Sequence, residues 1–299
     1  MKKGVLYGLG AYVLWGFFPI YWKVLHQVSA LQVIGHRIGW SFIVLILYIL
    51  LTKQWQEFRS VAFKPKTIGI YAVAGVLLSL NWLVYVWGVN AGFIVETSLG
   101  YFINPLLSVL LGVVFLRERL RPAQWIPVIL AAIGVIYLTV VYGRLPWIAL
   151  SLAFSFGIYG LVKKLAPLGS LYGLTLETAM VLPIALTYLV FVEINGTGAF
   201  LHDGARIDLF LAGAGVVTTI PLLMFASAAK QIPLTMIGIL QYIAPTLQFF
   251  IGVFIYKEPF IRSHLIGFGI VWVALIIFWV ENLLANRIPM EPIAELGEG

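Results

Sequence analysis

The chain has 299 residues, of which 62% are hydrophobic and only 10% are charged. Soluble domains carry about 25% charged residues, so this composition excludes an ordinary soluble protein and indicates an integral membrane protein. The absence of cysteine excludes disulfides, thiolate metal sites and cysteine nucleophiles. The net charge of +7 does not indicate nucleic-acid binding, because Lys and Arg in membrane proteins mark cytoplasmic loops.

Ten segments have the roughly 20 mostly apolar residues that a transmembrane helix needs. The first starts in "MKKGVLYGLGAYVLWGFFPIYW", which also resembles a signal peptide. Its apolar run is too long and no small-residue cleavage site follows, so we expect an uncleaved span. The expected spans are 5–25, 31–52, 68–90, 92–115, 124–142, 146–165, 171–192, 207–228, 234–256 and 262–284. The longest polar gaps between them are 53–67 and 193–208.

The distribution of Lys and Arg predicts the orientation of these spans. With the N-terminus inside, 13 of the 19 basic residues fall in inner loops and 5 in outer loops. The remaining one, Arg37, lies within the second span. We therefore expect a multi-pass protein of the inner or plasma membrane with both termini in the cytoplasm.

The two halves of the chain match each other. At a shift of 140 residues, "INPLLSVLLGVVFLRE" (103–118) aligns with "IAPTLQFFIGVFIYKE" (243–258) and shares its Pro, Gly and Glu positions. A shift of 141 aligns 15–23 with 156–164. We predict a first repeat at 1–142, a second at 143–284 and a cytoplasmic tail at 285–299. Each repeat holds an odd number of spans, so the fold class is all-α, with ten transmembrane helices as two inverted five-helix repeats.

Several motifs together resemble a known family of transporters. They are "AYVLWGFFPIYWK", "HRIGWS", "NWLVYVWGVN", "ETSLGYFINPL" and "LQYIAPTLQFFIGVFIYKEP". The pattern resembles the RarD branch of the EamA-type drug/metabolite transporters and runs from about residue 4 to 284. This resemblance implies two inverted EamA repeats and a carrier role. Members of the branch are associated with chloramphenicol sensitivity, but the resemblance names no substrate.

Two charged positions inside predicted spans are candidate functional residues. Arg37, next to His36, lies in the apolar run "LQVIGHRIGWSFIVLILYILL" (31–51), and Glu96 lies at a similar depth in the fourth span. Ionisable groups within the membrane usually face a cavity or a partner. We therefore expect Arg37 and Glu96 to pair; the alternative is an Arg that reaches to the headgroups from the lipid face.

Polar and aromatic residues in other spans complete the candidate set. Glu96 starts a face that includes Asn104, and such a face either lines a cavity or allows close packing. Tyr12 and Trp15 lie near mid-membrane, where they form either an aromatic wall or ordinary packing. Asn81 either joins helices or contacts a solute. The candidate substrate-binding or coupling residues are Arg37, Glu96, Asn104, Asn81, Trp15, Tyr12, His36, Tyr101, Gln241, Gln248 and Glu177.

For some further residues the sequence predicts secondary or structural roles. Glu177 matches His36 at the shift of 141, and we expect it to be a proton site or a counter-ion. Thr218 and Thr219 are expected to satisfy backbone groups freed by Pro221. Glu118 and Glu258 are expected to form exposed structural pairs, and Trp22, Trp55, Trp125 and Trp147 to anchor the span ends.

These patterns predict a carrier rather than an enzyme. No H-E-x-x-H, G-x-S-x-G or D-x-D motif occurs, so we expect no catalysis, cofactor or metal. We expect export or exchange of small organic metabolites or drugs, such as amino acids or amphenicol-like compounds. Alternating access coupled to protons through Glu96 would drive it. The alternative is a passive facilitator or channel. The expected partners are the solute, the proton and the lipid bilayer, without nucleic acid; the oligomeric state is not specified.

Overall fold

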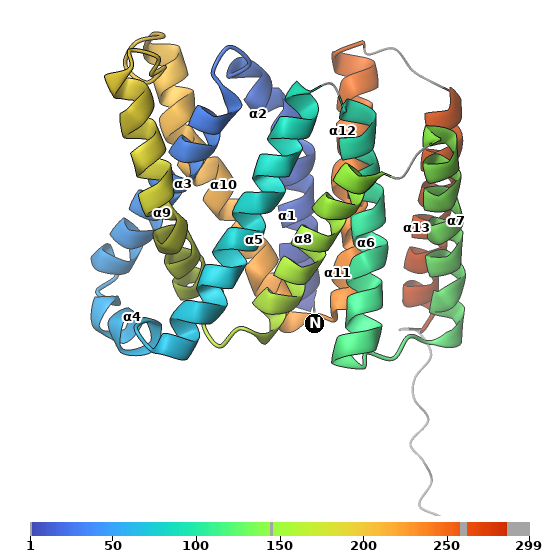
Figure 1. The fold of residues 1–299 in the computed structure, drawn as a ribbon. Helices are drawn as coiled ribbons and strands as arrows, with labels where there is room; N and C mark the ends of the chain where they lie inside the picture. The colour runs from blue at the N-terminus through green and yellow to red at the C-terminus, as the bar shows by residue number, and fades with distance from the viewer. Residues whose placement is uncertain (1, 92, 144–145, 258–261, 286–299) are drawn as a thin grey trace, which may run out of the picture.

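A computed structural model describes residues 2–91, 93–143, 146–257 and 262–285. Every regular element in these ranges is helical, and the helices run side by side in one bundle (Figure 1). Nine of the described helices are long and apolar enough to cross a membrane, and a further helix carries a shorter apolar stretch at Leu265–Glu281. The predicted all-α membrane fold with ten spans is confirmed at this level.

The spans begin and end within a few residues of their predicted positions. Two of them are built from more than one element. The first consists of α1 (Lys2–Gly16) and α2 (Phe18–Val24), and the ninth of α11 (Leu234–Gln241), α12 (Ile243–Phe250) and η1 (Ile251–Ile255). The others are α3 (Ala30–Leu51), α5 (Pro65–Asn90), α6 (Ile94–Leu116), α7 (Pro122–Tyr142), α8 (Trp147–Leu165), α9 (Ser170–Ile194), α10 (Ala205–Gln231) and α13 (Arg262–Ala285).

Local chemistry explains several helix ends. The Ser29 hydroxyl accepts a hydrogen bond from the Gln32 amide at 3.4 Å and caps α3. Gly143 ends α7 with a φ of 78°, which glycine adopts without a steric cost. The ninth span breaks at Tyr242, because Pro245 has no N–H for the carbonyl four residues earlier. Its counterpart Pro105 lies inside α6 without interrupting the helix.

The sequence did not predict α4 (Trp55–Ala62), which lies in the polar gap at 53–67. Phe58 and Ala62 are buried against α9 and the start of α5, whereas Glu57 and Arg59 are exposed. A short helix with one apolar and one charged face is suited to the membrane surface. Its eight residues are too few for a spanning signal.

The packing of the spans follows the predicted pairing of the two halves. α6 packs on α8, and its counterparts α11 and α12 pack on α1 in the same way. The contact of α3 with α10 corresponds to that of α9 with α5. The contact of α1 with α10 corresponds to that of α8 with α5. Three spans also pack on their own counterparts, namely α7 on α13, α3 on α9, and α6 on α11. An inverted duplication produces this reciprocal pattern. The boundary at residues 142 and 143 stays a prediction.

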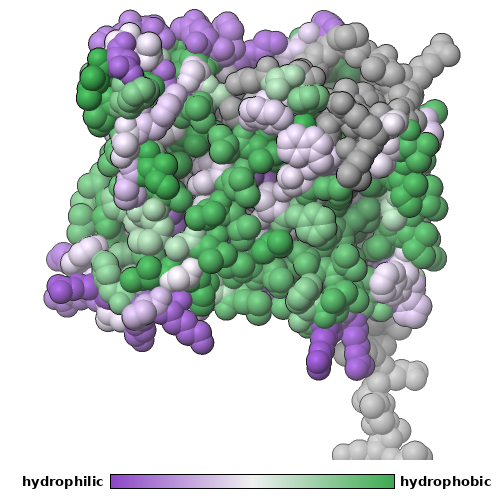
Figure 2. All heavy atoms as spheres, in the orientation of Figure 1, coloured by the Kyte–Doolittle hydropathy of each residue, from purple (hydrophilic) through white to green (hydrophobic). Residues whose placement is uncertain are grey.

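Close approach of α6 and α11 depends on a glycine. A Cβ atom on Gly238 would lie 2.5 Å from the carbonyl oxygen of Pro105, so only glycine fits there. The surface of the bundle is apolar in its middle and hydrophilic at its two ends (Figure 2). Large apolar side chains such as Ile184 (74% exposed) face outward from the spans. A bilayer would cover this band.

Candidate functional site

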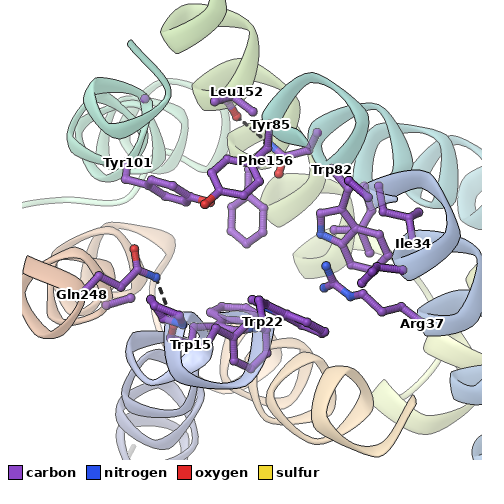
Figure 3. Close-up of a pocket in the computed structure, with 18 of the residues that line it drawn as sticks. Trp15, Trp22, Ile34, Arg37, Trp82, Tyr85, Tyr101, Leu152, Phe156 and Gln248 are labelled. Carbon is purple, nitrogen blue, oxygen red and sulfur yellow. Dashed lines mark hydrogen bonds between the residues drawn. The ribbon is translucent and has the colours of Figure 1, made fainter. Parts of the chain in front are cut away.

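A cavity of about 640 Å³ lies inside the bundle, within the range of small-molecule sites. Its lining reaches from Gln27 and Ser29, in the connection between α2 and α3, to Leu222 and Ala244 deep in the bundle. We call the end of the bundle with the α2–α3 connection the open end. Most of the cavity wall is aromatic or aliphatic (Figure 3). The lining side chains come from α1, α2, α3, α5, α6, α8, α10, α11 and α12.

Arg37 is the one charged Lys, Arg, Asp or Glu side chain among the described residues that line this cavity. Its guanidinium carbon lies 4.7 Å from the centre of the Trp22 ring and 4.1 Å from that of Trp82. Its Nε donates a hydrogen bond to Thr218 Oγ1 at 3.0 Å. Figure 3 shows the side chain extending from α3 into the cavity between the two indoles. Arg37 therefore faces the interior and not the lipid.

Two expectations from the sequence are wrong here. Trp22 does not serve only as an anchor at a span end, because it lines the cavity and covers Arg37. Thr218 binds the Arg37 side chain instead of a backbone group freed by Pro221. Its neighbour Thr219 has no hydrogen-bond partner for its buried hydroxyl among the described residues. Sequence reasoning missed this contact because the two residues are 181 positions apart in the chain.

Two amides hold the walls of the cavity together. Asn81 Nδ2 donates to Leu152 O at 2.9 Å and to Ser155 Oγ at 3.0 Å, which joins α5 to α8. Gln248 Nε2 donates to Trp15 O at 3.0 Å, which joins α12 to the end of α1 where that span breaks. Both residues line the cavity, and both connect helices from different halves.

The inner wall of the cavity is a cluster of aromatic rings. Trp15 lies 5.4 Å from Tyr12, 5.9 Å from Phe156 and 5.7 Å from Phe225, measured between ring centroids. Tyr159 stacks on Phe225 at 5.9 Å on the far side. Tyr12 and Trp15 therefore combine the two alternatives from the sequence. Their rings pack against their neighbours, and they also form part of the aromatic wall of the cavity.

Three polar atoms at the cavity lining are buried without a hydrogen-bond partner among the described residues. They are the Tyr12 hydroxyl, Asn104 Oδ1 and Gln241 Oε1. Buried polar atoms are almost always paired in proteins. These three atoms are exceptions to that rule among the described residues.

The structure brings most of the predicted site residues together. Eight of them line the cavity: Tyr12, Trp15, Arg37, Asn81, Tyr101, Asn104, Gln241 and Gln248. His36 does not line it, and its ring packs 5.1 Å from that of Phe200 instead. The side chain of Glu96 lies outside the described residues, so its pairing with Arg37 stays a prediction.

Glu177 lies apart from the main cavity, in a buried ion pair. Its Oε1 accepts a hydrogen bond from Lys163 Nζ at 2.6 Å, and its Oε2 accepts one from the Tyr159 hydroxyl at 3.2 Å. The Lys163 and Glu177 side chains are 3% and 1% exposed. The pair joins the last turns of α8 to α9 at the end of the bundle where the N-terminus lies (Figure 1).

Several contacts within the second half seal this end. Lys164 Nζ donates to Ile232 O at 2.6 Å and Ala229 O at 3.2 Å, and Lys230 Nζ donates to Ala166 O. At most 1% of the surface is exposed in each of Ala229, Ile232 and Leu234. We call this the closed end.

Glu118 also belongs to the closed end, where it has the expected structural role and lies 3.9 Å from Lys164 Nζ; the expected exposure is wrong. Its side chain is 13% exposed, and its two oxygens accept from the backbone amides of Leu234 and Thr235 at 2.7 and 2.9 Å. These are the first amides of α11, so Glu118 caps a helix of the other half. A Cβ on Gly112 would lie 2.7 Å from Glu118 Oε2, so the glycine makes room for the carboxylate. The counterpart Glu258 lies outside the described residues.

Comparison with known proteins fits this architecture. The EamA-like transporter family matches residues 2–140. The "Uncharacterized transporter YojE" of Bacillus subtilis is 49% identical over 291 residues and covers 96% of both chains. The chain belongs to the EamA-like transporter family. "Protein RarD" of Streptomyces exfoliatus is 44% identical over 286 residues, which cover 96% of this chain and 91% of the relative, so this is a RarD-type EamA transporter.

A solved structure supports the fold of this EamA transporter. A chain described as "Crystal structure of protein" aligns with a TM-score of 0.71 and covers 96% of this chain and 99% of its own. The sequence identity is 18%, so the likeness concerns the fold alone.

Proposed function

We propose that this protein is a secondary carrier that exports or exchanges small organic solutes by alternating access in the inner or plasma membrane. Amino acids and amphenicol-like compounds are the solutes to test. The observation that carries the proposal is the cavity between the two halves, which is open at one end of the bundle and sealed at the other. Carriers with inverted repeats bind their solute near the middle of the membrane, between the repeats.

Inverted symmetry supplies the second conformation. Because the halves share one plan, each can adopt the conformation of the other, which would close the open end and open the closed one. With both termini in the cytoplasm, as the Lys and Arg distribution predicts, the cavity of this conformation faces outward. The contacts of Lys163, Lys164, Lys230 and Glu118 would then form the inner gate.

Proton coupling is part of the proposal, and Glu177 is its first candidate among the described residues. A second cavity of about 20 Å³ lies between Arg37 and Glu177, next to Ser41, Ser79 and Thr178. Arg37, Trp82 and Leu222 line both this small cavity and the solute cavity, so Glu177 is separated from the solute cavity by this small space only. Glu96, which the sequence favours, stays the alternative.

Solute-driven proton flux in proteoliposomes tests the proposal. A pH-sensitive dye inside the vesicles would report pH changes after addition of amino acids, nucleosides or amphenicols under an imposed pH gradient. We expect a saturable, solute-dependent change with wild-type protein. The flux should be lost in Lys163→Met/Glu177→Gln, which removes both members of the buried pair. It should persist in Glu96→Gln if Glu177 carries the proton.

The outcomes separate the carrier from the channel that the sequence left open. A carrier shows counterflow, in which unlabelled solute inside the vesicles accelerates entry of labelled solute. Non-saturable flux without counterflow would contradict the proposal and favour a passive channel. Saturable counterflow without a pH change would retain the carrier and exclude proton coupling.

A further inference from the structure

The immediate surroundings of Arg37 specify what the cavity can bind, on the basis of the proposed carrier function. Two indole rings lie against the guanidinium, and Thr218 accepts the hydrogen bond of Nε. A guanidinium has five N–H donors, of which four are on the two terminal nitrogens. No carboxylate of the described residues forms an ion pair with Arg37.

Among the described residues, this arrangement has no countercharge for Arg37. A charge within a membrane span costs free energy unless it has a partner or contacts water. Aromatic rings compensate a guanidinium only in part, and a threonine hydroxyl carries no net charge. The described lining of the cavity offers no other Asp, Glu, Lys or Arg. The missing countercharge is therefore supplied most simply by an anionic group of the solute.

We propose that Arg37 binds the carboxylate of the transported solute and that Thr218 is the residue that positions it. The terminal nitrogens of a guanidinium match the two oxygens of a carboxylate in a planar, bidentate contact. Trp22 and Trp82 restrict the guanidinium plane, and the Thr218 contact fixes the Nε edge, so the terminal edge is directed to the solute. Because Arg37 carries a single positive charge, it balances the charge of one carboxylate on the solute and not that of a second.

The rest of the cavity indicates the body of this solute. Trp15, Phe156, Tyr85 and Tyr101 present aromatic surface to it, as Figure 3 shows. The inferred class is therefore small monocarboxylates with an aromatic or apolar body. Neutral amphenicols would lack the group that Arg37 recognises, and organic cations would be repelled by it.

A pair of nearly isosteric probes tests this directly. Binding of 3-phenylpropanoate and of its neutral amide, 3-phenylpropanamide, would be measured on purified protein in lipid nanodiscs by tryptophan-fluorescence quenching and equilibrium dialysis. A charge-assisted bidentate contact gives the acid about tenfold or greater preference. Arg37→Gln should reduce this preference to about twofold or less, and Arg37→Lys should leave an intermediate value. Equal affinities for acid and amide in wild-type protein, or no binding of either at millimolar concentrations, would overturn the proposal.

Substitutions at two adjacent threonines test the positioning role. Thr218→Val removes the hydroxyl with little change of shape and should lower the acid preference severalfold, whereas Thr218→Ser should retain it. Thr219→Val is the matched control, because Thr219 is equally buried and does not contact Arg37. Equal effects of Thr218→Val and Thr219→Val would exclude a specific role of Thr218.

Glu96→Gln addresses the competing explanation that Arg37 is neutralised within the protein. If the two residues pair, this change would free Arg37 and raise the affinity for 3-phenylpropanoate about tenfold, which would contradict a free anion site. We expect less than about a threefold change. Carboxylate-selective binding without any counterflow would refute the carrier function but support the Arg37 carboxylate site. Counterflow with equal affinities for acid and amide would support the carrier function but refute the carboxylate site.

Discussion

The two ends of the bundle use equivalent positions of the two halves in opposite ways. A shift of 141 residues places Trp22 on Lys163 and His36 on Glu177. At the open end, Trp22 lies against Arg37 beside a cavity. At the closed end, Lys163 and Glu177 form an ion pair that is almost fully buried. Corresponding spans of the two halves therefore hold a cation that forms no ion pair among the described residues at one end, and a neutralised pair at the other.

This difference indicates how divergence after duplication can separate binding from gating. Exact symmetry would give both ends the same side chains and the same affinity for the solute. Here the first half places the cation in the cavity, and the second half places the ion pair in the seal. The following substitutions break or sharpen this comparison.

The largest effect is expected at the ion pair. Lys163→Met leaves the Glu177 carboxylate without its countercharge, and Glu177→Gln does the same to Lys163, so each should lower the free energy of unfolding by about 3–5 kcal/mol. The double variant Lys163→Met/Glu177→Gln should recover most of the loss, because no unpaired charge remains buried. Denaturant unfolding in detergent micelles measures all three. A double variant as unstable as either single variant would contradict the account of the pair.

The helix cap at the closed end should have an intermediate effect. Glu118→Ala leaves the amides of Leu234 and Thr235 without acceptors and should cost about 1–3 kcal/mol. Glu118→Gln keeps one acceptor oxygen and should cost less. The same unfolding measurement compares the two, and equal losses would indicate that the capping bonds contribute little.

At the open end, Arg37→Gln should change stability by only about 1 kcal/mol or less. The guanidinium borders the cavity and loses one hydrogen bond and two aromatic contacts, while its own desolvation is relieved. Carboxylate preference should nevertheless be lost. A destabilisation as large as that of Lys163→Met would show that Arg37 is a structural residue, and the two ends would then be alike.

The smallest effect concerns an exposed pair between the last turn of α9 and the following loop. His202 Nε2 lies 2.7 Å from Glu193 Oε1, and this carboxylate raises the pKa of His202. A raised pKa means that the pair contributes stability below the unfolded value of about 6.5 and loses it as the pH rises through the folded value. Thermal unfolding of wild-type and His202→Gln protein at about pH 5.5 and pH 8.5 should differ only at the lower pH. An equal difference at both values would contradict the pairing.

Sequence patterns predicted much of this molecule for identifiable reasons. Long apolar runs specify spans because the bilayer sets their length, so the ten expected segments match the described helices within a few residues. Arg37 and the polar residues of the fourth and ninth spans were identified because polar groups in an apolar run require a special environment. Eight of the predicted site residues line one cavity, although their roles stay predictions.

The remaining features depend on contacts that no local pattern encodes. Thr218 meets Arg37, and Glu118 meets Leu234, only because distant helices are packed together. Lys163 was counted as a loop residue, and its burial becomes evident only with Glu177 beside it. The eight residues of α4 were too short and too polar to register. The periodicity of a sequence shows which residues share a face of a helix, but it does not show which buried polar groups of distant helices meet.

The most direct test of the central claim is the accessibility of single cysteines at the two ends, since the chain has none of its own. Ala244→Cys places a thiol in the cavity, and Ala229→Cys places one in the closed end, where the alanine is 0% exposed. A membrane-impermeant thiol reagent should label the first from one side of the membrane and not the second. In the Lys163→Met/Glu177→Gln background, labelling of Ala229→Cys should rise while that of Ala244→Cys falls. Labelling rates that change independently, or in the same direction, would contradict alternating access between the two ends.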